Sequence, residues 1–334
     1  MNLFTSSSKY KNTYIPLAVG VAILVIVNVA VWALPDGHYR KAFNRMLSIA
    51  REQGGRAEVV VFGDSRATMF NAAFFNAPTL SFACANNTIV YSKFLFDRMI
   101  AETGVKPKVV VLMLGANNYN ANGIFTLRDF ALRRLTTFGD ITRIAQAPGG
   151  RPYALDAFFS KAFPVYGRRM EIRSPRQIVS MVRSGAVTVG AMEPPAKEYR
   201  APERSEIEDL NYLMIYRRSV YVNYRISQFH AWVLESLIDQ SEALGARVVL
   251  VQLPVEPVMR KLHDEVVGQV FDEYLADLAQ RKGAVLLDLR NNLDYEFADL
   301  NHLTERGAMG LTREILNPVI DSLLVPAPEP AARQ

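Results

Sequence analysis

The stretches EVVVFGDSR (residues 58–66) and KVVVLMLGANN (residues 108–118) decide the fold class of this chain. Each is a short apolar run that ends in glycine and is followed at once by polar residues. Three further apolar runs lie at residues 79–83, 247–253 and 284–288. Runs that are apolar on both faces indicate strands covered on both sides, which is typical of a parallel sheet.

Helical patterns separate these runs, at residues 39–53, 91–102, 227–244, 263–282 and 304–324. Because buried strands alternate with helices, we predict an α/β fold, a doubly wound and mainly parallel five-stranded sheet in a flavodoxin-like α/β/α sandwich. The third and fourth strands are separated by far more chain than a βαβ crossover needs. Residues 120–225 are therefore predicted to contain a long helical insertion.

The predicted insertion is more basic than the rest of the chain. It holds 17 Lys and Arg against 10 Asp and Glu, whereas the whole chain has a net charge of +5. An exposed helical cap with a solvated basic face explains this excess without a function. A surface for an anionic polymer, lipid headgroups or a membrane partner is the alternative. The chain lacks the dense Lys/Arg blocks of a nucleic-acid arm, so no nucleic-acid partner is expected.

Residues 15–34, IPLAVGVAILVIVNVAVWAL, contain no charge. As a helix they would be about 30 Å long, so we predict a single transmembrane anchor. A cleaved signal peptide is the alternative, although signal cores usually run to roughly 7–15 residues. The charges that flank the span do not decide its orientation. Because long downstream domains translocate regardless of flanking charge, we expect the body to lie outside the cytoplasm, held on the inner (cytoplasmic) membrane.

The predicted organisation follows from these segments. Residues 1–14 form a cytoplasmic N-terminus, residues 15–34 the anchor, and residues 35–57 a tether. Residues 58–324 form the folded domain, and the Pro- and Ala-rich residues 325–334 a disordered tail.

Cysteine and glycine usage narrows the classes of function. Cys84 is the single cysteine, which excludes an intrachain disulfide framework and a multi-thiolate metal site. No metal-binding constellation is visible, and no cofactor is expected. The first turn, GDSRATMF, lacks the glycine-rich phosphate cradle of a dinucleotide site. A flavodoxin-like cofactor binder is therefore disfavoured.

Polar residues that can carry chemistry follow the predicted strands. Ser65 follows the first strand, Asn117 follows the third, and Asp299 and His302 precede the last helix. Ligands of such sheets bind beyond the carboxyl ends of the strands. In an Asp-x-x-His segment the carboxylate can orient the imidazole. Singly, these residues have ordinary roles as a helix cap, a turn former and a surface histidine. Together they predict a nucleophilic serine.

The set GDSR, GANN and DLNH resembles three sequence blocks of the SGNH (GDSL-like) hydrolase superfamily, across residues 58–310. The resemblance implies that Ser65 is the nucleophile, His302 the general base and Asp299 its orienting acid. It also implies that Asn117 and the Ser65 N–H are oxyanion-hole donors, and that the motifs are supported by Gly63, Asp64, Arg66 and Gly115.

One block departs from the pattern of that superfamily. Residues 81–88 contain no glycine after the second strand, where the superfamily usually has one whose N–H completes the oxyanion hole. Asn86 is expected to take this position, because asparagine tolerates the left-handed backbone conformation that glycine usually adopts.

The single N-terminal span, the GDSR variant and the Asn-His-Leu segment before the last helix are similar to the membrane-anchored branch of the superfamily. That branch includes the D-alanine transfer protein and the alginate O-acetylation proteins. The resemblance implies an O-acyltransferase or esterase that acts on a cell-envelope polysaccharide through an acyl-Ser65 intermediate. It implies an acylated donor and an integral-membrane O-acyltransferase as partner. The alternative is a catalytically silent scaffold partner of such an acyltransferase.

Overall fold

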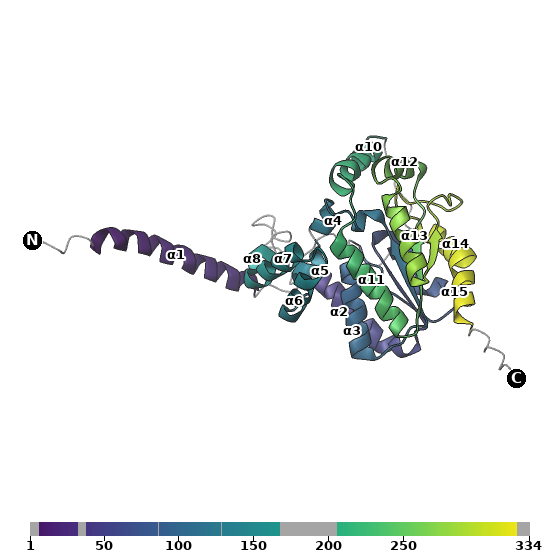
Figure 1. The fold of residues 1–334 in the computed structure, drawn as a ribbon, viewed down its shortest axis with the longest axis horizontal. Coiled ribbons are helices and arrows are strands. Elements are labelled where there is room, and N and C mark those ends of the chain that lie inside the picture. Colours follow the sequence, from purple (N-terminus) through teal and green to yellow (C-terminus); the bar gives the residue numbers. More distant parts are fainter. Residues whose placement is uncertain (1–6, 33–37, 86, 128, 168–205, 326–334) are drawn as a thin grey trace, which may run out of the picture.

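A computed structural model of the chain describes residues 7–32, 38–85, 87–127, 129–167 and 206–325. A long N-terminal helix projects from a body that is built around one parallel sheet (Figure 1). The strands of this sheet are β1 (Val59–Gly63), β2 (Thr79–Ser81), β3 (Val109–Leu114), β4 (Arg247–Gln252) and β5 (Val285–Asp288).

The sheet has five strands in the order β2-β1-β3-β4-β5, and every neighbouring pair is parallel. Val59 of β1 pairs with Thr79 on one side and with Val109 on the other. This is the strand order of doubly wound flavodoxin-like sheets, in which the direction of winding reverses between β1 and β3. The predicted fold class is therefore confirmed, and the reversal marks the edge at which a ligand site is expected.

Both faces of the sheet are covered, which explains its continuous apolar strands. Alternate side chains point to opposite faces, so Val60 and Phe62 join one core cluster and Val59 and Val61 join the other. The first cluster packs under α2 (His38–Gln53), α3 (Ile89–Thr103), α11 (Gln228–Ala243), α12 (Pro257–Val266) and α13 (Val270–Lys282). The second packs under α14 (Glu305–Leu311), the π-helical turn η6 (Thr312–Leu316) and α15 (Asn317–Leu324).

Two of the predicted helices differ in detail from those observed. The single helix predicted for residues 263–282 is wrong, because α12 and α13 are separate helices. Gly268 lies between them with a φ of +60°, a left-handed conformation that favours glycine and ends α12. The helix predicted for residues 304–324 is helical from Glu305 onward, but η6 interrupts its α-helical hydrogen bonding.

The connection between β3 and β4 carries most of the additional helices. These are α4 (Ile124–Leu127), α5 (Phe130–Arg134), α6 (Phe138–Gln146), α7 (Arg151–Ala162), α8 (Pro164–Gly167), α10 (Glu206–Ile215) and the π-helical turn η5 (Tyr216–Val220). Residues 128 and 168–205 of the predicted insertion lie outside the described residues. In Figure 1, α6, α7 and α8 gather where the N-terminal helix meets the body, and α10 lies at the top of the body, next to α12 in this view.

The N-terminal helix α1 runs from Ser7 to Trp32. Within it, Tyr14–Trp32 has a mean hydropathy of 2.5, and it is the one helix in the described part of the chain that is long and apolar enough to cross a membrane. Side chains from Tyr14 onward are exposed, except where Asn28 and Val31 face α8. The last residues of the predicted anchor, 33 and 34, the start of the tether and residues 326–334 of the predicted tail lie outside the described residues.

Candidate active site

Ser65 is positioned by the turn that follows β1. The strand ends at Gly63, and the short 3-10 turn η2 (Ser65–Met69) begins after Asp64. The Asp64 side chain caps this turn, because its Oδ1 accepts a hydrogen bond from the Arg66 N–H at 3.0 Å. Ser65 is half-buried, whereas Asp64 and Arg66 are buried. The cap therefore fixes a partly accessible serine at the carboxyl end of β1.

The loop before α14 brings an imidazole and a carboxylate to this serine. His302 Nε2 lies 2.9 Å from Ser65 Oγ. His302 Nδ1 lies 2.8 Å from each carboxylate oxygen of Asp299. A carboxylate on Nδ1 favours the tautomer in which Nε2 is free to accept a proton from the serine hydroxyl. The structure thus brings together the three residues for which the sequence predicts a catalytic role, and that role stays a prediction.

The Asp299 carboxylate is held in its charged form by its own loop. It accepts the N–H of Asn301 at 2.7 Å and the N–H of His302 at 2.8 Å, in addition to the imidazole. Burial alone would raise the pKa of Asp299, but the hydrogen bond and charge of His302 and the two backbone donors outweigh it and hold the pKa below its usual range. Asp299 is therefore ionised at neutral pH, which is the state that stabilises an imidazolium.

A buried ion pair joins the ends of β1 and β3 beside Ser65. Arg66 Nε and Nη2 donate to the two carboxylate oxygens of Asp64 at 3.0 and 2.7 Å. Asn118 Nδ2 donates to Asp64 Oδ2 at 3.0 Å. Burial would raise the pKa of Asp64, but the charge and hydrogen bonds of Arg66 outweigh it and hold that pKa below its usual range. Asp64 and Arg66, two residues of the GDSR motif, thus form a rigid support for the turn that carries Ser65.

The two motif glycines are required by close packing around this pair. A Cβ on Gly115 would overlap with the Arg66 guanidinium, and a Cβ on Gly63 would overlap with the Ala67 side chain. Neither glycine has a positive φ, so the requirement is space and not backbone conformation.

Asn117 lies in the same network, in the 3-10 turn η4 (Ala116–Asn118) after β3. Its Oδ1 accepts a hydrogen bond from Arg66 Nη2 at 3.3 Å. Its Nδ2 donates to Asp64 Oδ2 and to Asn118 Oδ1, each at 3.4 Å. Both distances exceed the 2.9–3.0 Å typical of N–H···O hydrogen bonds, so these contacts orient the amide but are weak hydrogen bonds. Its role as an oxyanion donor stays a prediction, and Asn86, the second predicted donor, lies outside the described residues.

A group of tyrosines around η5 is a feature that the sequence did not predict for the site. Tyr212 OH accepts a hydrogen bond from Asn301 Nδ2 at 3.2 Å and donates to Tyr216 OH at 3.3 Å. Tyr224 OH donates to the Ala116 carbonyl at 3.1 Å. Asn301 immediately precedes His302, so α10 and η5 are tied to the loop that carries His302. The sequence does carry one indication of this group. Tyr212 and Tyr216 are four residues apart, and residues at this spacing lie on the same face of a helix.

A second Ser–His–Asp set lies elsewhere in the body and has a structural role. Ser227 Oγ is 2.9 Å from His230 Nδ1, and His230 Nε2 is 3.3 Å from Asp129 Oδ2. His230 is 0% exposed, and Ser227 is 3% exposed. Ser227 is the N-cap of α11 and Asp129 is the N-cap of α5, so both polar side chains accept hydrogen bonds from the first turn of a helix. Ser65 is the more accessible of the two hydroxyls.

The single cysteine is not activated as a nucleophile. Burial raises the pKa of Cys84 to about 11, which keeps that thiol protonated.

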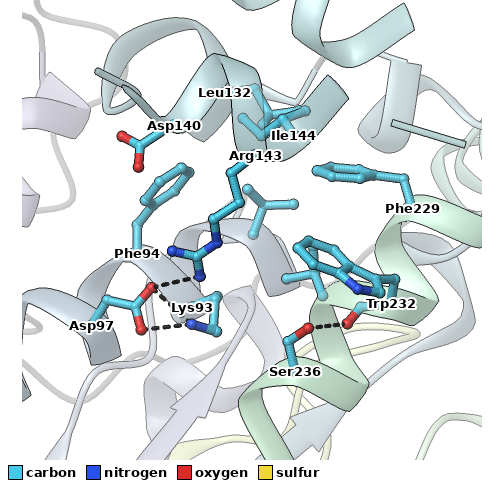
Figure 2. Close-up of a pocket in the computed structure, with 12 residues that line it drawn as sticks. Lys93, Phe94, Asp97, Leu132, Asp140, Arg143, Ile144, Phe229, Trp232 and Ser236 are labelled. Atoms are coloured by element: carbon cyan, nitrogen blue, oxygen red, sulfur yellow. Dashed lines mark hydrogen bonds and ion pairs between the residues drawn. The ribbon is translucent and has the colours of Figure 1, made fainter. Parts of the chain in front are cut away.

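A separate apolar pocket lies between α3, α6 and α11. Figure 2 shows Phe229 and Trp232 of α11 on one side of it, Phe94 of α3 on the other, and Leu132 and Ile144 at the top. One edge is charged, because Asp97 accepts from Lys93 Nζ at 2.6 Å and lies 3.8 Å from Arg143 Nη2. Neither this pocket nor any cluster of His, Cys, Asp and Glu in the described residues provides a metal site.

Comparisons with known proteins give distant structural likenesses only. No family model matches the chain, and no curated protein matches it. The crystal structure of TesA is 13% identical, with a TM-score of 0.37, and covers 80% of this chain and 99% of its own. A proposed platelet activating factor from Streptococcus pneumonia is 11% identical, with a TM-score of 0.37, over 92% of this chain and 99% of its own. A proposed acylhydrolase from Bacteroides fragilis is 10% identical, with a TM-score of 0.39, over 84% and 97%. At these identities and TM-scores, the likenesses carry no information about the chemistry of this chain.

Proposed function

We propose that this protein is a membrane-anchored serine acyl-transfer enzyme of the SGNH (GDSL-like) hydrolase superfamily, with Ser65 as its nucleophile. The observation that carries the proposal is the hydrogen-bonded series from Ser65 Oγ through His302 to Asp299, at 2.9 and 2.8 Å. The same three residues stand in the sequence blocks that resemble the superfamily. A charged Asp299 supports the assignment, because a serine hydroxyl needs a base that can hold its proton.

The chemistry divides into two matched halves. In the first, the Ser65 Oγ–H proton passes to His302 Nε2 while Oγ forms a bond to the ester carbonyl carbon. The tetrahedral intermediate collapses, the carbon–oxygen bond to the leaving alcohol breaks, and the alcohol takes the proton from Nε2. In the second half, His302 deprotonates a water or sugar hydroxyl, whose oxygen attacks the acyl carbon. The bond to Ser65 then breaks, and the proton returns to Oγ.

The negative charge on the tetrahedral oxygen needs hydrogen-bond donors at a fixed position. We assign the Ser65 N–H, the Asn117 side-chain amide and the Asn86 N–H to this role. The weak 3.4 Å contacts of Asn117 Nδ2 support its assignment, because the amide can exchange them for a shorter bond to an oxyanion.

The site is proposed to face the cell envelope. The apolar helix Tyr14–Trp32 would anchor the chain as a single pass in the inner (cytoplasmic) membrane, with the body outside the cytoplasm. An envelope polysaccharide would then accept the acyl group, and an integral-membrane O-acyltransferase would supply it as partner. Water as the acceptor would instead make the enzyme an esterase.

The proposal is tested by trapping the acyl-enzyme. The full chain in detergent is incubated with p-nitrophenyl acetate and read by intact mass spectrometry, followed by peptide mapping. We expect one acetyl adduct on Ser65, absent from Ser65→Ala. Ser227→Ala is the matched control, because it removes the hydroxyl of the other Ser–His–Asp set. It should keep the adduct.

Two results would overturn the assignment. An adduct that persists in Ser65→Ala and disappears in Ser227→Ala would show that Ser227, in the buried Ser–His–Asp set, is the nucleophile. A folded protein with no adduct and no release of p-nitrophenol would support the alternative function, a silent scaffold for a membrane acyltransferase. Adding candidate polysaccharides to the acetylated enzyme then separates transfer from hydrolysis.

A further inference from the structure

The helices beside the N-terminal anchor expose an aromatic face to solvent. We define this aromatic face by five side chains of α7, α8 and the residue between them, each at least 37% exposed: Leu155, Phe158, Phe159, Phe163 and Tyr166. Spacings of three and four residues place Leu155, Phe158 and Phe159 on one side of α7. The opposite side of α7 is buried through Ala154, Ala157 and Ser160.

The rings of this face are organised by contacts with one another. Phe159 stacks on Phe163, with ring centroids 6.2 Å apart, and meets Phe158 and Tyr166 edge to face at 5.7 and 6.3 Å. Tyr166 OH donates to Asp156 Oδ1 at 2.6 Å. A connected apolar patch of this kind on a folded surface marks an interaction site.

The aromatic face adjoins the last turns of α1. Asn28 Oδ1 of α1 accepts the Val165 N–H of α8 at 3.2 Å, and Val31 is only 7% exposed. Asn28 precedes Trp32 by four residues, which is about 6 Å along a helix. Figure 1 shows α8 and α7 at this end of α1, between the anchor and the rest of the body. The level of Val165 along the anchor is therefore inside the apolar stretch and not beyond it.

We propose that the aromatic face of α7 and α8 lies in the interfacial layer of the bilayer that α1 crosses. The inference rests on the proposed membrane anchor. If Tyr14–Trp32 spans the hydrocarbon layer, a helix bonded to Asn28 has to enter the headgroup region. Aromatic side chains are favoured at that depth, where a helix buries its apolar face about 5–10 Å into the boundary.

The charges of α7 are arranged as this location requires. Asp156 is the single acidic residue of α7, and it points into the body, where it pairs with Arg133 at 2.5 Å. Arg151 is exposed and lies at the first turn of α7, four residues before Leu155, at a position suited to a lipid phosphate. Together with the hydrogen bond that ties α8 to the anchor helix, this favours a lipid surface as the occupant. The docked face would fix the height and tilt of Ser65 above the membrane.

The test uses single-cysteine variants of the full chain in a Cys84→Ala background. A fluorescent NBD label is placed at Phe158→Cys in α7, at Ile23→Cys in α1, and at Val270→Cys on α13. Val270 is a matched control, because it is an exposed apolar residue at 48% on another part of the body. The protein is reconstituted in phosphatidylcholine–phosphatidylglycerol vesicles, with or without a nitroxide lipid. The nitroxide is near the headgroup for the labels at positions 158 and 270, and deep in the acyl chain for the label at position 23, which is at the middle of Tyr14–Trp32.

We expect the nitroxide lipid to quench at least half of the fluorescence at position 158 and to leave position 270 unchanged within error. Quenching at 23 but not at 158 overturns this inference and leaves the anchor intact. Absence of quenching at 23 overturns the anchor and this inference with it. The vesicles contain no other protein. A face that binds a membrane-protein partner and not lipid would therefore leave the label at position 158 unquenched while the label at position 23 is quenched.

Discussion

Replacing Asp299 with asparagine should slow acyl transfer strongly while leaving the fold in place. Asparagine has nearly the same size, and its oxygen can still accept the N–H groups of Asn301 and His302, which lie 2.7 and 2.8 Å from the carboxylate. What it loses is the negative charge beside the imidazole. It also offers an N–H to Nδ1, which favours the tautomer with the proton on Nε2, and that tautomer cannot accept the proton of Ser65.

The size of the effect follows from the exposure of the pair. The side chains of His302 and Asp299 are 23% and 29% exposed, so an effective dielectric constant near 20 applies and not that of water. Two unit charges about 4 Å apart then attract by about 4 kcal/mol. At about 1.4 kcal/mol per factor of ten, loss of this attraction from the transition state slows the reaction by roughly 10³-fold. The wrong tautomer extends the loss toward about 10⁴-fold.

The assay is the kcat/KM for p-nitrophenyl acetate, measured on the full chain in detergent. Asp321→Asn is the matched control, because Asp321 accepts a hydrogen bond from Asn76 on the surface and lies outside the triad. That variant should keep wild-type activity. Asp299→Asn in a Ser65→Ala background should cause no further loss, because the residues act as a unit. A decrease in kcat/KM of less than about tenfold in a folded Asp299→Asn protein would refute the reasoning. Such a small decrease is what the loss of the His302–Asp299 attraction would cause if the two charges were screened as in bulk water.

Three further predictions concern the network beside Ser65. Asn117→Ala should lower kcat by roughly 100-fold or more with little change in KM, as loss of an oxyanion donor does. An increase in KM with kcat unchanged would argue against this role. Gly115→Ala should lower the free energy of unfolding by about 1–3 kcal/mol, because the new Cβ displaces the Arg66 guanidinium. Gly55→Ala is the control, because Gly55 has open space around it, and should change this free energy by less than about 0.5 kcal/mol. Urea unfolding of both variants measures the difference. Because the folded-state pKa of Asp64 lies below its unfolded value, its contribution to stability is complete above about pH 4 and is lost as the pH falls through the lower folded-state pKa. Urea unfolding of Asp64→Asn should therefore show a weaker dependence on pH below 4 than wild type, and an unchanged dependence would contradict the buried ion pair.

The sheet and the proximity of Ser65, Asp299 and His302 could be predicted because their signals are local or follow from topology. The apolar runs at residues 58–62 and 108–114 correspond to β1 and β3 within one residue. A parallel sheet places the ends of these strands at one edge, so Ser65 and Asn117 had to be neighbours. Asp299 and His302 are three residues apart, and such a short spacing largely fixes their mutual geometry.

The parts that sequence reasoning missed depend on packing between distant segments. Nothing in the residues around Arg66 indicates that its guanidinium lies against Gly115 and binds Asp64 in two places. The hydrogen bond from Asn301 to Tyr212 joins residues 89 positions apart. The break at Gly268 was missed because the apolar periodicity of α12 continues into α13.

On the proposed mechanism, the order of the site residues along the chain has a consequence for biogenesis. Ser65 and His302 are separated by 237 residues, and the His302 loop precedes only the final helices. During synthesis, the proposed nucleophile emerges long before its proposed base. A partly made chain would therefore carry an inert hydroxyl that cannot acylate itself or cleave esters around it. Activity would begin only when the C-terminal segment has docked, so ester turnover would report completed folding of the whole body.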